Sequence, residues 1–319
     1  MKVAVLIMSA NKEPSLRNIE AMRETFIKQV EDGSFKNDYD FFEYYFDENL
    51  EIEKVEVIQK SKNFYSIRIG GYETVYRTYE KTYFAFKHLI ESDSFPEYER
   101  FIRINISSYL NMNLLDSVIE SAEDNKIYAA ALNTYINGEA PELTNHLYAR
   151  GDFYIMSRKT VKGILDYGKD ILYNDIADKN RLMINHVDDT LMGYAYIQYM
   201  GLKHYFDNLN MVYYGFIPNP TENLNEISNN INKNALTTRV KTVPPTVAYS
   251  GYSWDDNEYR LYDVKKIKII HEILKNCKYT IKSINDLIVP IKEERSTVVV
   301  NLLPAKPSEI KKYLRRVIK

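Results

Sequence analysis

Hydrophobic positions at the start of the chain follow two different spacings. The run "KVAVLIMS" (2–9) is continuously apolar and of strand length, which is typical of a parallel strand covered on both faces. The following "SLRNIEAMRETFIKQV" (15–30) places apolar residues from Ile19 to Val30 on one face, as an amphipathic helix does. The pattern therefore predicts a buried strand followed by a helix.

The same succession recurs further along the chain. Strands are predicted at "DYDFFEYYFDEN" (38–49) and "ERFIRINI" (99–106), and helices at "VYRTYEKTYFAFKHLIES" (75–92) and "NLLDSVIESAE" (113–123). The segments "KIYAAALN" and "FYIMS" are further strand candidates. Alternating strands and helices predict an α/β fold, with a Rossmann-like, mostly parallel sheet that carries helices on both faces.

The pattern changes after residue 217. The segment "IPNPTENLNEISNNINKN" is polar and rich in asparagine, and the next segment is interrupted by Pro244-Pro245 and Gly251. The last residues, "KPSEIKKYLRRVIK", are basic and amphipathic. We therefore predict one α/β domain over residues 1–219 and a C-terminal extension over 220–319, loop-rich and then helical, packed on it.

Composition excludes several classes of protein. The formal net charge is −2, whereas a general nucleic-acid binder usually has a clear basic excess, so we expect no nucleic-acid partner. The apolar runs are short and interrupted, so we expect no transmembrane segment. The single cysteine, Cys277, excludes a disulfide within the chain and fits a reducing compartment. We expect a soluble, cytoplasmic protein.

Polar residues come directly after each of the predicted strands. These are Ser9–Asn11, Asp47–Asn49 and Asn105–Ser108. The carboxyl ends of parallel strands meet at one edge of a sheet, where α/β proteins bind their ligands, so we expect a ligand there. Alternatively, Asn105–Ser108 cap the following helix or form a turn.

The chain has no GxGxxG after its first strand, no GxxxxGK[ST] and no GxSxG, which gives no support to a dinucleotide site, a P-loop or a serine hydrolase.

Several short motifs follow one another along the first two-thirds of the chain. They are "YRTYEKT" (76–82), "FIRINISSYLN" (101–111), "YARGDFYIMSRKTVKGIL" (148–165) and "NHVDDTLMGYAYIQYMGLKHY" (185–205). Together they resemble the galactosyltransferase and Fringe-type glycosyltransferases and the related capsular or viral glycosyltransferases, which have a GT-A fold. The resemblance extends over about two-thirds of the chain, residues 1–215, and implies that the domain over 1–219 binds a nucleotide sugar and carries the catalytic site.

The resemblance rests on individual positions. The family motifs fall on Lys81, Thr82, Arg103 through Asn111, Gly151, Tyr154, Ser157, Asp188, Asp189, Thr190, Gly193, Met200 and Gly201, while Tyr76 lies one place out of register and Asp188 replaces a Glu. It implies a transferase that moves a hexosyl or pentosyl unit from a nucleotide sugar, with a UDP-sugar favoured, to a carbohydrate acceptor. Glycan or capsular polysaccharide biosynthesis, in a bacterium or a virus-infected host cell, is the implied setting.

The sequence departs from these families where they bind a metal ion. Their Asp-x-Asp motif falls on Asn105-Ile106-Ser107, and an amide and a hydroxyl bind a divalent cation poorly because they carry no charge. We expect no required metal, and at most weak use of Mn²⁺ or Mg²⁺. We assign donor binding to Ser9, Ala10, Asn11 and Asp47, because these residues follow strands whose ends converge, and the resemblance adds Lys81, Arg103, Asn105 and Ser107. Cations that could replace the metal are Lys81, Arg103, Arg150, Arg239, Arg260, Arg315 and Arg316.

The acidic pair Asp188-Asp189 is the candidate catalytic site. An inverting glycosyltransferase needs a carboxylate that takes the proton of the attacking hydroxyl, and in the resembling families this pair supplies it. Asp189 is the preferred base, with Asp188 beside it. Alternatively, the two aspartates form an acidic first turn that complements a helix dipole.

Acceptor binding is assigned to two segments. Gly151 and Asp152 lie in the matched "RGDFY" segment, and Tyr252 and Trp254 could stack on a sugar face. Around Trp254 a solvated loop before a helix is an equal alternative.

Two other functions also stay open: a catalytically silent relative that binds glycans or a protein partner, and a transferase of the phage type that acts on modified DNA bases.

Overall fold

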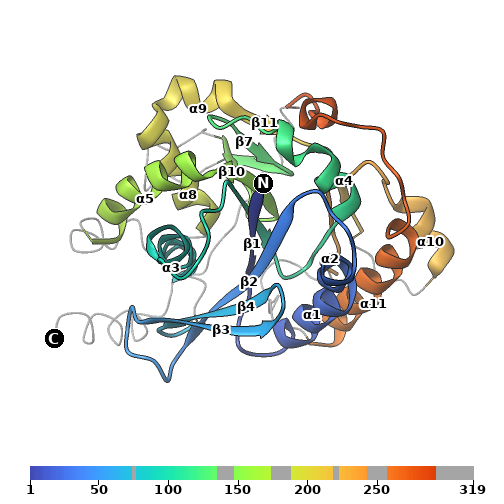
Figure 1. Cartoon of the computed structure of the whole chain (residues 1–319), viewed down its shortest axis with the longest axis horizontal. Helices are drawn as coiled ribbons and strands as arrows, with labels where there is room; N and C mark the ends of the chain where they lie inside the picture. The colour runs from blue at the N-terminus through green and yellow to red at the C-terminus, as the bar shows by residue number, and fades with distance from the viewer. Residues whose placement is uncertain (74–76, 135–146, 174–187, 218–222, 243–256, 292–319) are drawn as a thin grey trace.

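The computed structural model describes residues 1–73, 77–134, 147–173, 188–217, 223–242 and 257–291. Within them the chain forms an α/β fold around an eight-stranded sheet with the order β11-β7-β10-β5-β1-β2-β4-β3. Helices lie on both faces of this sheet (Figure 1). No described helix combines the length and the apolar character that a membrane crossing requires.

The centre of the sheet contains the three strands that the hydrophobic pattern predicts. β1 (Lys2–Met8) lies between β2 (Asp38–Asp47) and β5 (Arg100–Asn105) and pairs with both in parallel. β4 (Phe64–Gly70) continues the parallel arrangement beside β2. The residues of β1 from Val3 to Ile7 are fully buried, as expected of a strand covered on both faces.

The outer strands make the sheet mixed rather than purely parallel. β3 (Val55–Ser61) pairs with β4 in antiparallel orientation, because the turn between them is too short for a crossover connection. On the other side, β10 (Phe153–Ser157) runs antiparallel between β5 and β7 (Ile127–Ala129). β11 (Leu209–Met211) is parallel to β7 at the edge.

Two groups of helices cover the two faces. One face carries α1 (Ser15–Met22), the π-helical turn η1 (Arg23–Ile27), α2 (Lys28–Asp32), α4 (Met112–Val118), the turn η3 (Ile119–Ser121) and α11 (Asn257–Leu274). The opposite face carries α3 (Thr78–Glu91), α5 (Arg158–Tyr173), α8 (Asp188–Met200) and α9 (Leu202–Asn208). The predicted helices at 15–30, 75–92 and 113–123 are confirmed in position, and the first continues through a π-helical turn.

Several smaller elements accompany the central sheet. A three-stranded sheet consists of β6 (Ser108–Leu110), β13 (Thr237–Arg239) and β12 (Tyr214–Phe216). β8 (Leu132–Thr134) pairs with β9 (Leu147–Ala149), and α10 (Leu224–Asn230) and η5 (Ile284–Leu287) complete the described elements. Because β6 comes directly after β5, β13 lies next to the end of a central strand.

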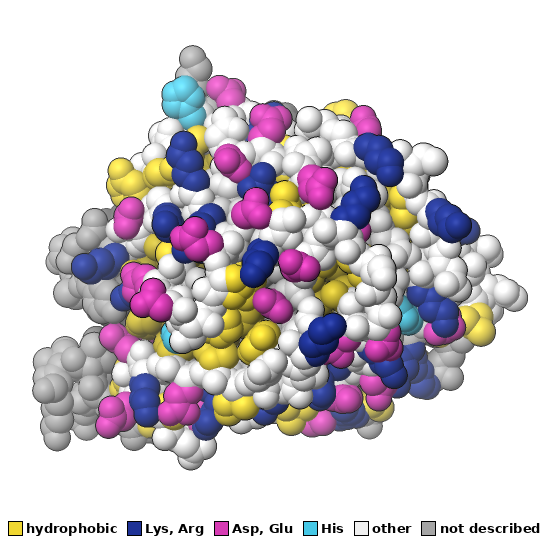
Figure 2. Space-filling model, in the orientation of Figure 1, with side chains coloured by type: hydrophobic (Ala, Val, Ile, Leu, Met, Phe, Trp, Pro, Cys, Tyr) yellow, Lys and Arg dark blue, Asp and Glu magenta, His cyan; other side chains and the backbone are white. Residues whose placement is uncertain are grey.

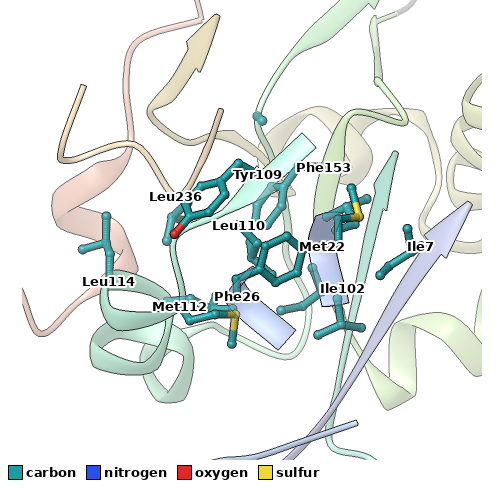
Figure 3. Packing of buried hydrophobic residues seen from close by; sticks show 14 of the residues in the cluster. Ile7, Met22, Phe26, Ile102, Tyr109, Leu110, Met112, Leu114, Phe153 and Leu236 are labelled. Carbon is teal, nitrogen blue, oxygen red and sulfur yellow. The ribbon is translucent and has the colours of Figure 1, made fainter. Parts of the chain in front are cut away.

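One hydrophobic core joins the central sheet to the C-terminal elements. Figure 3 shows Ile7, Ile102 and Phe153 from the sheet against Phe26 and Tyr109. The rings of Phe26 and Tyr109 meet edge to face with centroids 5.6 Å apart. The same cluster includes buried isoleucines of α11. The division at residue 219 stays a prediction, and the described elements before and after it share this core.

The face in Figure 2 has the mixed surface that the balanced composition predicts. Lysine and arginine side chains alternate there with aspartates and glutamates, around an apolar patch below the middle of the view.

Candidate functional site

The predicted convergence of polar residues at the strand ends is present. Asn105 ends β5 and pairs in register with Met8 at the end of β1, so Ser9 lies beside it. The Ser9 amide donates to the carbonyl oxygen of Tyr44 at 3.0 Å, which ties this residue to β2. The parallel register therefore brings together residues that are almost 100 positions apart in the sequence.

The "NISS" segment at the end of β5 forms a turn and does not cap the next helix. Ile106 and Ser107 form the turn from β5 to β6, and the Ser107 carbonyl accepts a hydrogen bond from the Val240 amide at 3.0 Å. The cap of α4 is Asn111, whose side chain accepts from the Leu114 amide at 3.3 Å. The turn holds the β5 end against the residues just after β13.

Arg103, near the end of β5, has a fully buried guanidinium. Its Nε donates to the Tyr44 hydroxyl at 3.4 Å, its Nη2 lies 3.1 Å from the Met8 sulfur, and its Cζ lies 5.9 Å from the centre of the Tyr154 ring. A Cβ atom at Gly151 would lie 2.1 Å from Arg103 Nη1. The guanidinium therefore lies against the backbone of Gly151, and only glycine leaves room for it.

Asp152 is an ion-paired residue just before β10. Its two carboxylate oxygens lie 2.5 Å from Nη1 of Arg239 and 2.9 Å from Nη2 of Arg150. Burial by itself would raise the pKa of Asp152, but Arg239, Arg150 and Arg103 together lower it below its ordinary value. The carboxylate is thus charged and shared between two arginines, which leaves it little capacity to bind a metal ion.

Helix α11 supplies a second ion pair beside the first. Arg260 Nε lies 2.5 Å from Oδ2 of Asp263, and Oδ1 of Asp263 accepts from the Thr242 amide at 2.7 Å. Lys266 Nζ donates to the Ile217 carbonyl at 2.8 Å and to the Thr242 hydroxyl at 2.7 Å. Asp263 and Lys266 are fully buried, so α11 holds the residues after β13 in place.

These contacts assemble basic side chains from separate parts of the chain. We name the group the strand-end cluster; it consists of Arg103, Arg150, Arg239, Lys241 and Arg260 with the carboxylates Asp152 and Asp263. Burial and the neighbouring arginines lower the pKa of Arg239, although Asp152 raises it, so the positive charges act on one another. The cluster holds more cations than carboxylates within one region.

Lys241 is the member of this cluster that the sequence alone did not reveal. It lies two positions after Arg239, and in an extended segment that spacing puts two side chains on the same face. Burial, and then the charges of Arg239 and Arg260, lower the pKa of Lys241 to about 6. The period-two spacing of Arg239 and Lys241 was the only sequence signal available.

Two of the predicted donor-binding residues already have charged partners. Lys81 Nζ donates to the Ser9 carbonyl at 2.7 Å and to Oε1 of Glu73 at 2.6 Å. The carboxylate of Asp47 accepts from Nε of Arg68 at 2.8 Å and from the Asn49 amide at 2.9 Å. Both residues lie where predicted and stabilise the loops at the strand ends.

The loop after β1 contains a buried polar group. Ser9 Oγ is buried and has no hydrogen-bond partner among the described residues. Such groups in a native protein call for an explanation, such as a bound water or ion or a functional role. Ala10 is half-buried and Asn11 is exposed beside it.

The side chains described at the strand ends do not fit the binding of a divalent cation. Among the described residues, no three histidine, cysteine or acidic side chains lie close enough together to hold one. The carboxylates of Asp47 and Asp152 at the strand ends are bound by arginines, and Asn105 and Ser107 are neutral.

Several predicted residues lie outside the part of the chain that the structure describes. The backbone of Asp188 and Asp189 begins α8, as the helix-start alternative predicts, but their side chains are outside the described part. Tyr252, Trp254, Arg315 and Arg316 are also outside it. The roles assigned to these residues stay predictions.

The chain is similar to solved structures but not to known sequence families. No protein-family model matches it, and no curated protein matches it. A glycosyltransferase involved in the glycosylation of the major capsid of PBCV-1 is similar, with 10% identity and a TM-score of 0.43, over 84% of this chain and 100% of that chain. The galactosyltransferase LgtC, in complex with donor and acceptor sugar analogs, is similar with 8% identity and a TM-score of 0.44, over 86% of this chain and 97% of that chain.

Proposed function

We propose that the chain is a nucleotide-sugar-dependent glycosyltransferase that binds the donor's diphosphate at the strand-end cluster and does not require a divalent cation. The observation that carries this proposal is the excess of cations over carboxylates in this cluster, at the carboxyl edge of the sheet. The motif order in the sequence supplies the reaction class.

The charge balance of the cluster favours an anionic ligand. Among the described residues its four arginines outnumber the two carboxylates of Asp152 and Asp263, whether or not Lys241 is charged. Arg150 is 44% exposed, but the other three arginines are largely buried, and a buried charge without a counter-ion is unfavourable by several kcal/mol, on the order of the desolvation cost of an ion. A ligand with two negative charges would offset much of this excess.

The chemistry of glycosyl transfer accounts for cations at this place. When the bond between the anomeric carbon and the diphosphate oxygen breaks, the bonding electrons leave with the nucleoside diphosphate. In many transferases a metal ion stabilises this charge, but positive side chains that are already oriented can do the same. Arginine is suited to it because its guanidinium donates two parallel hydrogen bonds to a phosphate.

The remaining assignments come from the sequence, through the strand-end positions, the aromatic residues and the family resemblance. The nucleoside lies along Ser9–Asn11, where Ser9 Oγ offers a hydrogen bond, and Asn105 and Ser107 contact the ribose or phosphate. The acceptor hydroxyl attacks the anomeric carbon from the opposite side, with inversion, and Asp189 takes its proton. A UDP-sugar is the favoured donor and a carbohydrate hydroxyl the acceptor; Tyr252, Trp254 and Gly151 are assigned to the acceptor side.

Thermal unfolding in EDTA with UDP-glucose, UDP or UMP tests the donor site. A ligand that binds only the folded state raises its unfolding temperature, and the increase grows with ligand concentration. We expect UDP-glucose and UDP to raise it more than UMP, and Arg239→Ala to remove most of the difference. Arg17→Ala, which removes an exposed arginine paired with Glu13, is the matched control and should leave the shifts unchanged.

Two results would contradict the proposal. If no diphosphate raised the unfolding temperature, or if each did so only with Mn²⁺ present, the strand-end cluster would not be a metal-free donor site. Release of UDP from UDP-glucose, measured with and without added oligosaccharides, then separates an active transferase from a silent binding protein.

A further inference from the structure

Lys241 differs from the other cations of the strand-end cluster in its surroundings. It is 8% exposed and lies in the chain between Arg239, the last residue of β13, and Thr242, whose amide donates to Asp263 of α11 at 2.7 Å. The backbone therefore holds Lys241 beside both ion pairs of the cluster. Asp152 and Asp263 already lie within 3 Å of the guanidinium groups of Arg239, Arg150 and Arg260. These carboxylates are therefore already in contact with guanidinium groups.

We propose that Lys241 is a further binding residue for the donor's diphosphate, and that it takes up a proton from solvent when the diphosphate binds. This inference rests on the proposed function, because it requires a diphosphate at the strand-end cluster. It goes beyond that function in naming the residue and the proton that completes the site.

The free site disfavours a charged Lys241 for two reasons. Burial removes the water that stabilises an ammonium, and Arg239 and Arg260 repel a third positive charge. These two effects lower the pKa of Lys241 to about 6, while the more weakly acting Asp152 and Asp263 raise it. The side chain is then mainly neutral at pH 7.5 until an anion arrives.

A bound diphosphate reverses the balance of charges. Its two negative charges would face Lys241 together with Arg239 and Arg260, so the ammonium becomes the favoured form and the pKa of Lys241 rises. The proton comes from the solvent, and no bond other than the new N–H forms or breaks in the protein. A neutral lysine in the free protein also reduces the repulsion among the positive charges of the cluster before the ligand binds.

The direction of the pH dependence is set by these two protonation states. Below about pH 6 Lys241 is protonated in both states, and diphosphate affinity does not depend on its titration. Between that pH and the raised pKa of the complex, binding takes up a proton, so affinity falls as pH rises, by at most about tenfold per pH unit. Above the raised pKa no proton is taken up.

Isothermal titration calorimetry measures this proton directly. We would titrate the full chain at pH 7.5 with UDP-glucose, GDP-mannose and ADP-ribose, each in PIPES, HEPES and Tris buffers. The diphosphate of these ligands is a diester that does not titrate in this range, so the protein must be the source of any buffer dependence. The observed enthalpy should vary linearly with the ionisation enthalpy of the buffer, with a slope near one proton taken up per ligand bound.

Two substitutions at the same position make the test specific. Lys241→Gln should bind about tenfold more weakly, with no proton uptake and little pH dependence, because the titrating amine is gone. Lys241→Arg keeps a permanent charge and should bind without taking up a proton. Lys233→Gln removes an exposed lysine from the turn before β13 and should behave as the wild type.

The outcomes distinguish the two proposals. Failure of all three ligands to bind would overturn both the donor site and the role of Lys241. Binding by the wild type without proton uptake, or uptake that persists in Lys241→Gln and Lys241→Arg, would overturn the role of Lys241 alone. Proton uptake that both variants lose, while Lys233→Gln retains it, is the result we expect.

Discussion

Gly151 and Arg103 approach each other so closely that a Cβ atom at position 151 would lie 2.1 Å from Nη1 of the arginine. Arg103 comes from β5 and Gly151 from the turn before β10, and the antiparallel pairing of these strands brings them together. The absence of a side chain at position 151 thus decides where a buried positive charge lies in the strand-end cluster.

Gly151→Ala should weaken diphosphate binding. The added methyl group would force the guanidinium of Arg103 out of its position, and we expect about a tenfold loss of affinity for UDP-glucose, equivalent to about 1.4 kcal/mol. Calorimetry on Gly151→Ala, Arg103→Ala and the double variant measures whether the two sites are coupled. If Gly151→Ala still reduced affinity in the Arg103→Ala background, the glycine would act in some other way.

Asp152→Asn should lower the stability of the fold at neutral pH. Loss of one partner from a buried ion pair typically costs about 3–5 kcal/mol, and Asn leaves Arg150 and Arg239 without their carboxylate. The folded-state pKa of Asp152 is lowered, so its stabilising contribution is present above the unfolded-state pKa and is lost as pH falls through the folded-state pKa. Urea denaturation should therefore show a large difference from the wild type at pH 7 that shrinks on acidification below about pH 4.

Glu43→Gln should have the opposite effect on stability. Glu43 of β2 is 8% exposed, and burial raises its pKa, although the hydrogen bond from Ser66 and the charges of Lys60 and Arg23 partly offset this. A raised folded-state pKa means that the contribution of Glu43 is favourable below the unfolded-state pKa and is lost as pH rises. The glutamine variant should be more stable than the wild type at pH 8 and about equal at pH 4, as measured by urea denaturation. A variant that is less stable at pH 8 would contradict this.

Asp189→Asn should nearly abolish transfer while nucleotide affinity stays similar. Removal of a general base typically lowers the rate by about 10²–10⁴. Asp188→Asn should reduce the rate less if it only orients Asp189 or an acceptor hydroxyl. Initial rates of UDP release in the presence of acceptor give the order of severity. Wild-type turnover in both variants would mean that the acidic pair serves only to begin α8.

Removal of divalent cations should leave transfer largely unchanged. Asn105 and Ser107 carry no charge where the resembling families have two carboxylates, and the strand-end cluster supplies positive charge instead. We expect similar initial rates in EDTA and in Mn²⁺. Loss of activity in EDTA that Mn²⁺ restores would require a carboxylate ligand elsewhere, with Asp188 the first to examine.

Local patterns predicted the parts of the fold that depend on nearby residues. The apolar run of β1 and the helical spacing of α1 and α3 are visible within a few consecutive residues. A strand buried on both faces is continuously apolar, whereas a helix buried on one side has hydrophobic residues every three or four positions. The β3–β4 hairpin was not predicted from the pattern, since Ile58 breaks the alternation that Val55 to Val57 begin, and polar residues such as Lys60 follow it on an exposed edge strand. Edge strands often carry such residues, which protect them from further pairing.

Candidate residues at the strand ends could be predicted from the sequence, because parallel strands end at the edge of the sheet where α/β proteins bind their ligands. Ser9 and Asn105 lie side by side because they mark the ends of neighbouring parallel strands. Asp152 was assigned to acceptor binding, which stays a prediction, and the structure shows that its carboxylate is shared between Arg150 and Arg239. The residues next to Asp152 in the sequence do not indicate a partner as distant as Arg239, because an ion pair depends on distances that only the folded chain defines.

The sequence by itself determined the α/β class, the strand ends at which polar residues gather, and the absence of charge on the side chains of Asn105 and Ser107. Each of these depends on residue type and local spacing. Only the tertiary structure decided that Arg239, Lys241 and Arg260 meet near Arg103, because β13 pairs with β6 and α11 packs against the same core. Electrostatic effects such as the lowered pKa of Lys241 arise from burial and from neighbours distant in sequence, and these exist only after the chain has folded.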